Sequence, residues 1–74
     1  MEEYKIRLIE ETKELATKTN KLNDFMKTNF FYKLPRNKKD LLYEQYQLMV
    51  SYLRVLGLRL ELEEIDLEKE NFFE

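Results

Sequence analysis

Tyrosine rings and basic side chains are the groups in this chain best suited to hold a ligand. Tyr4 lies three residues before Arg7, and a ring near a cation is a common way to hold one nucleobase, by stacking and phosphate neutralisation. Lys18 and Arg59 fall on helical positions where apolar residues would pack better, and partly buried charges are costly unless paired. We therefore expect Lys18 and Arg59 either to meet an anionic ligand or to form salt bridges between subunits, as Glu11 would.

A second group of cations, Arg36, Lys38 and Lys39, follows Pro35 at the predicted start of a helix. Positive side chains oppose the helix dipole there, but a helix N-terminus surrounded by cations can hold an anion. These three residues are secondary anion candidates. The alternative is that Asn37 or Asp40 caps the helix and the lysines are solvated.

Most catalytic chemistry is excluded by composition. The chain has no His and no Cys, so it cannot form a Ser-His-Asp or Cys-His arrangement or an ordinary zinc site. A single glycine, Gly57, cannot build a phosphate-binding glycine-rich loop. We predict that the protein is not an enzyme and uses neither a metal nor a cofactor.

Length and charge narrow the class of protein further. A chain of 74 residues forms one domain with a thin core, and oligomerisation is the expected extra source of stability. The net charge of −2 argues against duplex nucleic acid as the partner. No long apolar run or secretory signal is evident, so we expect no membrane association and a cytoplasmic location.

Two long stretches have the apolar spacing of amphipathic helices, alternating steps of four and three residues. The first runs through Leu8, Thr12, Leu15, Thr19, Leu22 and Met26. The second runs through Leu42, Tyr46, Met49, Leu53, Leu56 and Leu60. We predict an all-α antiparallel hairpin in a single domain 1–74, with helices over about 2–27 and 36–64, a bend over 28–35 and an acidic tail over 65–74. A short helical extension in the tail is a further possibility, as is docking of its Phe72 and Phe73 on another subunit.

A second apolar row accompanies the seam of the second helix. Its members are Leu41, Gln45, Leu48, Tyr52, Val55, Arg59 and Leu62. Because one partner helix cannot cover both rows, we expect the surplus apolar surface to face another copy of the chain. Gly57 within this helix indicates either a close backbone approach or kink, or a tolerated solvent-facing position.

The order of these landmarks resembles a known family. The segments are "YKIRLIEETKEL", "NKLNDFM", "FYKLP" and "DLLYEQYQLMVSYLRVLGLRL", covering about residues 1–63. This succession resembles the small helical-hairpin proteins of the phage anti-CBASS sponges, including relatives in crAss-like phages. The matching positions are Lys21, Leu22, Phe25, Phe31, Leu34, Pro35, Leu41, Leu42, Gln45, Met49, Tyr52 or Leu53, Leu56 and Arg59.

The resemblance implies a phage anti-defence protein acting in the host cytoplasm. Such proteins form a homo-oligomer, commonly a hexamer, that sequesters cyclic di- and trinucleotide immune messengers without cleaving them. The sequence leaves open whether the messenger is a cyclic dinucleotide, a cyclic trinucleotide or a cyclic ADP-ribose-type signal, as captured by related anti-Thoeris hairpins. By position, Tyr4 would stack on a base, Lys18 and Lys21 would contact phosphate, and Arg59 would contribute from the second helix.

Two other functions remain open on sequence grounds. The acidic C-terminal half or a helix face could bind a host protein, as an anti-CRISPR-like inhibitor does. The chain could also be a purely structural helical oligomer, in which case Lys18 and Arg59 contribute only to stability.

Overall fold

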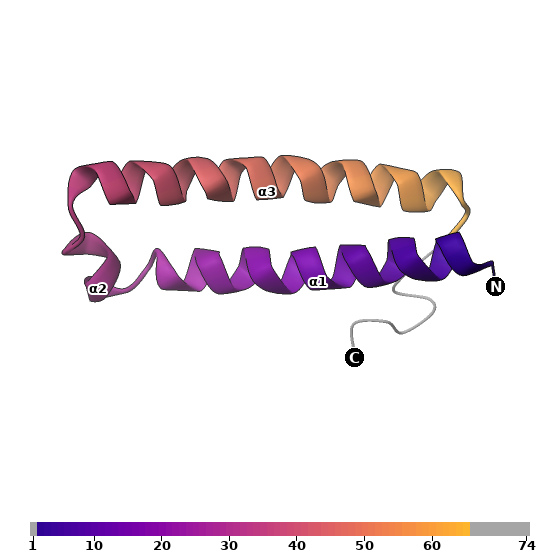
Figure 1. The fold of residues 1–74 in the computed structure, drawn as a ribbon, viewed down its shortest axis with the longest axis horizontal. Coiled ribbons are helices and arrows are strands. Elements are labelled where there is room, and N and C mark those ends of the chain that lie inside the picture. The colour runs from indigo at the N-terminus through magenta and orange to yellow at the C-terminus, as the bar shows by residue number, and fades with distance from the viewer. Residues whose placement is uncertain (1, 66–74) are drawn as a thin grey trace.

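Two long antiparallel helices form the structure, a computed structural model that describes residues 2–65. Helix α1 covers Glu3–Phe25, α2 covers Asn29–Tyr32 and α3 covers Arg36–Leu62. Figure 1 shows α1 and α3 lying side by side, with α2 at the closed end of the hairpin. The all-α antiparallel hairpin predicted from the sequence is thus confirmed.

The seam between α1 and α3 uses the two predicted rows of side chains. Leu8, Leu56 and Leu60 are buried, together with Ile9, which lies outside the predicted row. Thr12 and Thr19 are buried as well, and each hydroxyl donates to the carbonyl four residues earlier, at 2.8 and 2.7 Å. The threonines therefore occupy the seam without leaving a polar atom unsatisfied.

The bend contains a short helix that the sequence did not predict. Thr28 caps α2, because its Oγ1 accepts a hydrogen bond from the Phe31 N–H at 3.2 Å and donates to the Phe25 carbonyl at 2.7 Å. Phe31 is buried against Phe25, with ring centroids 6.0 Å apart, whereas Phe30 is 66% exposed. Phe31 therefore provides more of the packing that closes the hairpin than Phe30 does.

Helix α3 begins and ends in ways that refine the sequence prediction. Pro35 is its N-cap and makes no side-chain hydrogen bond to the helix. Asn37 Oδ1 accepts a hydrogen bond from the Lys38 N–H at 2.9 Å in the first turn, whereas Asp40 is paired with Arg36. The helix ends at Leu62, short of the predicted residue 64. Apart from Ile65, the predicted tail, with Phe72 and Phe73, lies outside the described residues.

The end of α3 is closed by a Schellman motif. The Ile65 N–H donates to the Leu60 carbonyl at 2.9 Å and the Glu64 N–H donates to the Glu61 carbonyl at 3.0 Å. This turn brings Ile65 onto the buried cluster that contains Ile9 and Leu60. Glu64 adopts a φ of 58° in the turn, a left-handed conformation that a side chain with a Cβ disfavours.

Gly57 lies in an uninterrupted stretch of α3 and makes no close approach within the hairpin. A Cβ added there would meet no atom within 4 Å. The sequence left open a close backbone approach or kink at Gly57, or a tolerated glycine. The structure supports the tolerated glycine, because no atom of the hairpin approaches this position closely.

We expect Glu64→Gly to stabilise the hairpin by about 0.5–1 kcal/mol, because glycine adopts positive φ without steric cost. Urea denaturation followed by circular dichroism measures the change. Glu64→Ala is the matched control, since it removes the same carboxylate but keeps the Cβ. A gain in the alanine variant equal to that in the glycine variant would contradict the conformational explanation.

We expect Gly57→Ala to raise the free energy of unfolding by about 1 kcal/mol, because alanine loses less conformational entropy in a helix. Ala16→Gly, at the middle of α1, should lower it by at least about 1 kcal/mol. Both changes can be read from the denaturation midpoint. Destabilisation by Gly57→Ala would reveal a contact at Gly57 beyond the single hairpin.

Candidate functional site

One long edge of the hairpin brings together three polar positions from each long helix. We call it the polar edge, and its members are Tyr4, Glu11 and Lys18 of α1 and Gln45, Tyr52 and Arg59 of α3. Within each helix they are seven residues apart, which is nearly two full turns, so each set follows one side of its helix. A hydrogen bond from the Tyr52 hydroxyl to Glu11 Oε2 shows that the two sides face each other.

The Tyr52 and Glu11 pair lies at the middle of this edge. The hydrogen bond that the Tyr52 hydroxyl donates to Glu11 raises the pKa of Tyr52 above its ordinary value, and desolvation of the hydroxyl raises it further. The positive charge of Arg59 acts in the opposite direction. Arg59 is therefore close enough to Tyr52 to influence its ionisation.

A second tyrosine and carboxylate pair lies at the open end of the hairpin. The Tyr4 hydroxyl donates to Glu63 Oε2 at 2.9 Å, and Lys5 Nζ lies 3.8 Å from the same oxygen. The hydrogen bond to Glu63 is the main reason that the pKa of Tyr4 rises to about 12. Tyr4 nevertheless keeps 52% of its surface exposed, so much of the side chain remains open to a ligand.

The contact between Glu11 and Tyr52 also fixes which other positions on the edge face each other. Moving seven residues forward on α1 and seven back on α3 places Lys18 opposite Gln45. Moving seven residues back on α1 and seven forward on α3 places Tyr4 opposite Arg59. The hydrogen-bond partner of Tyr4, Glu63, lies about one helical turn beyond Arg59. Lys18 therefore faces a position on α3 that is two steps of seven residues before Arg59, a distance of about 21 Å along the helix.

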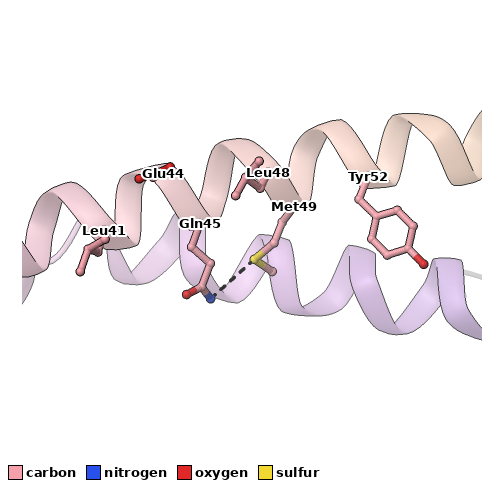
Figure 2. A pocket seen from close by; sticks show the side chains of 6 residues that line it. All are labelled: Leu41, Glu44, Gln45, Leu48, Met49 and Tyr52. Atoms are coloured by element: carbon pink, nitrogen blue, oxygen red, sulfur yellow. Dashed lines mark hydrogen bonds between the residues drawn. The ribbon is translucent and has the colours of Figure 1, made fainter.

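An open groove follows α3 from Leu41 to Tyr52. It encloses about 600 Å³ and is lined by Leu41, Glu44, Gln45, Leu48, Met49 and Tyr52. In Figure 2 the side chains of Gln45, Met49 and Tyr52 project from α3 toward α1. Gln45 Nε2 lies 3.8 Å from Met49 Sδ, so the amide has only a weak protein partner. The groove thus offers an apolar surface, one amide, one carboxylate and one tyrosine ring.

The structure places the remaining predicted site residues in two other regions. Arg7 is held by Glu3 at 2.6 Å on the outer surface of α1. Lys21 is three residues beyond Lys18 and therefore turned about 60° further from α3. Neither belongs to the polar edge, and both are exposed.

The secondary cations begin α3 at the closed end of the hairpin, far from Tyr4. Arg36 is exposed and lies 3.8 Å from Asp40. Lys38 is exposed and Lys39 is half-buried. Lys38 alone is on the same side of α3 as Gln45, seven residues earlier, so the structure does not gather the three cations into one anion site.

Sequence reasoning missed the contributions of Glu11 and Tyr52 to this region. Tyr52 was assigned to core or interface packing and Glu11 to the flank of α1. The repeated spacing of seven residues in both helices was the available signal, but it could not show which sides of the helices meet.

Two further properties of residues 2–65 bear on the type of site. No cluster of three or more acidic side chains that could hold a metal ion is present in this part of the chain. None of its helices is long and apolar enough to cross a membrane.

Comparison with protein-family models matches residues 2–62 to the family described as Sequestin. The match covers α1, α2 and α3 completely. Searches of curated proteins and of solved structures found no significant match.

The two tyrosine and carboxylate pairs predict a distinct alkaline titration. Because the hydrogen bonds favour the protonated phenols, the pKa of Tyr4 should be near 12 and that of Tyr52 should also exceed its ordinary value. The stability they contribute is present below about pH 10 and is lost as the pH rises through the folded-state pKa. Tyrosinate absorbance measures this titration.

Glu63→Gln should return the pKa of Tyr4 toward 10. The difference titration between each protein and its Tyr4→Phe derivative isolates this one phenol among the five tyrosines. An unchanged pKa of Tyr4 in Glu63→Gln would show that the carboxylate is not the cause.

Proposed function

Because the chain belongs to the Sequestin family, the phage anti-CBASS cyclic-oligonucleotide sponges, we propose that it binds cyclic oligonucleotide immune messengers and sequesters them without cleavage. It would act in the cytoplasm of the infected host, where these messengers are made. The proposed ligands are cyclic di- or trinucleotides.

The observation that carries this proposal is the alternation of aromatic and cationic groups along the polar edge. Tyr4 and Tyr52 are 52% and 45% exposed, so a base can reach each side chain. Lys18 and Arg59 are exposed on the same edge. Stacking on an aromatic ring and neutralisation of phosphate by nearby cations are the two interactions that a nucleotide needs.

The proposed absence of cleavage is supported by the side chains of this edge. Glu11 and Glu63 are its nearest candidates for a general base, and each accepts a hydrogen bond from a tyrosine hydroxyl. The chain offers no histidine and no cysteine as an alternative base or nucleophile. These groups suit retention of a phosphodiester better than its hydrolysis.

We also propose that the functional particle is a homo-oligomer, a hexamer as the family resemblance implies. A single hairpin presents the polar edge openly, and a pocket closed by two subunits buries more of a ligand. Surface for that closure is available on one side of α3, where the following apolar side chains are 45–84% exposed: Leu41, Leu48, Val55 and Leu62.

The proposal is tested by mixing the purified protein with a panel of cyclic di- and trinucleotides and removing unbound ligand. Heat denaturation then releases bound messengers for mass measurement. We expect at least one messenger to be retained at micromolar concentration and recovered with its mass unchanged. Release of linear products would contradict sequestration, and retention of none would contradict binding.

Substitution of the edge cations makes the same test residue-specific. Lys18→Ala should weaken messenger binding about 10- to 100-fold, because it removes one charge-assisted contact to phosphate. Arg54→Ala is the matched control, since it removes one exposed cation from α3 away from the polar edge. Isothermal titration calorimetry measures the affinities and circular dichroism checks the helices. Equal losses in the two variants would indicate only a general effect of charge.

A further inference from the structure

One side of α3 carries a row of side chains that α1 leaves exposed, although its polar members Gln45, Tyr52 and Arg59 also border α1. We call it the outer row, and it consists of Leu41, Gln45, Leu48, Tyr52, Val55, Arg59 and Leu62. All seven are exposed, and the apolar ends of the row, Leu41 and Leu62, are 67% and 84% exposed. Steps of alternately four and three residues are the spacing with which one helix packs along another.

The outer row has the same order of side-chain types in both directions from Tyr52. Leucines end it, polar residues come next, and branched apolar residues flank the tyrosine. A helix packed on an antiparallel copy of itself meets its own row in reverse order. Each apolar position of this row would then meet an apolar position, and Gln45 would meet Arg59.

We propose that α3 packs antiparallel against α3 of a second copy, about a two-fold axis close to Tyr52. The contact is isologous, because each copy presents the same outer row to the other. This inference supplies a geometry for the pockets of the proposed function, and it rests on that function only for the identity of the ligand.

Charge favours the antiparallel arrangement over the parallel one. A parallel pair in register would place Arg59 beside Arg59 within an apolar contact, where like charges are costly. The antiparallel pair places Arg59 beside Gln45, whose amide oxygen can accept its hydrogen bond. Among residues 2–65 the Gln45 side chain has one hydrogen-bond partner, the Met49 sulfur, so its amide oxygen is available.

The main consequence is a composite anion site. Within one chain Lys18 faces Gln45, whereas Arg59 lies about 21 Å away along α3. In the antiparallel pair, Arg59 of the second copy arrives beside Gln45 and therefore next to Lys18. The part of the groove at Gln45 and Met49, beside α1, is then flanked by one cation from each copy. The two-fold axis generates two such sites, each suited to a phosphodiester anion.

Cysteine cross-linking tests the arrangement directly, because the chain has no cysteine of its own. Leu48 and Val55 face each other across the proposed axis, so neither faces its own equivalent. We prepare Leu48→Cys and Val55→Cys separately, refold them together without ligand and oxidise them. Mass spectrometry should show the mixed disulfide dimer as the main covalent product, several-fold above either variant oxidised alone.

Gln47→Cys is the control, since Gln47 is exposed on α3 away from the outer row. It should cross-link with neither variant above the background of random collision. Efficient self-cross-linking of Leu48→Cys or of Val55→Cys would overturn the antiparallel register, and so would a mixed dimer no more abundant than that background. Circular dichroism of each variant establishes that it is helical before oxidation.

A charge exchange provides a second test in the cysteine-free protein. Gln45→Arg alone should weaken self-association at least tenfold, because it places a second guanidinium beside Arg59 of the other copy. The double variant Gln45→Arg with Arg59→Gln should restore association, since each guanidinium again faces an amide. Sedimentation equilibrium measures both. Failure of the second change to restore what the first removes would overturn the pairing.

The ligand experiments remain distinguishable from these. Cross-linking and sedimentation are performed without messenger, so they report only the contact between copies. A chain that cross-links as proposed but retains no messenger refutes the proposed function alone. A chain that retains messenger but self-cross-links at Leu48→Cys refutes the antiparallel contact alone.

Discussion

A layer of two helices can bury only one stripe of side chains from each, and most properties of this protein depend on that constraint. The buried cluster of Leu8, Ile9, Leu56 and Leu60 lies toward the open end of the hairpin, while Phe31 closes the bend. Between them Thr12 and Thr19 are buried, whereas the apolar members of the seam, such as Leu22, are half-buried. Every other side chain of α1 and α3 must lie at an edge or face outward.

Along the polar edge, hydrogen bonds connect the two sides of the hairpin at positions where the helices make little apolar contact. Two tyrosine hydroxyls donate to carboxylates of the opposite helix or the turn that ends it, from Tyr52 to Glu11 and from Tyr4 to Glu63. These bonds satisfy groups that remain accessible to water, so they contribute modestly to stability but define the lateral positions of the helices. They also occupy the acidic groups nearest to Arg59. A phenol donates its hydrogen bond without carrying a charge, so both carboxylates stay anionic and the proposed ligand site depends on Lys18 and Arg59 to offset them.

Much of the fold could be predicted from the spacing of apolar residues. The two predicted seams contain buried or half-buried side chains in the structure, because burial in a pair of helices follows the helical period. The short helix α2, the left-handed Glu64 and the burial of Ile9 were not predicted. Each depends on a contact that lies outside the repeat of one helix: Phe31 reaches Phe25 across the bend, and Ile65 returns to the cluster that contains Ile9. A single period carries no information about such contacts.

For the candidate site, the sequence by itself determined which residue types can contact a ligand and on which side of its own helix each one lies. It excluded histidine and cysteine chemistry, and it placed Tyr4, Lys18 and Arg59 at the borders of their seams. Only the tertiary structure decided that the border of α1 faces the border of α3, that Glu11 meets Tyr52 and that Lys18 lies opposite Gln45. The physical reason is that periodicity defines an angle around one helix, whereas the axial offset between two helices is set by their packing, by the bend and by the turn that ends α3.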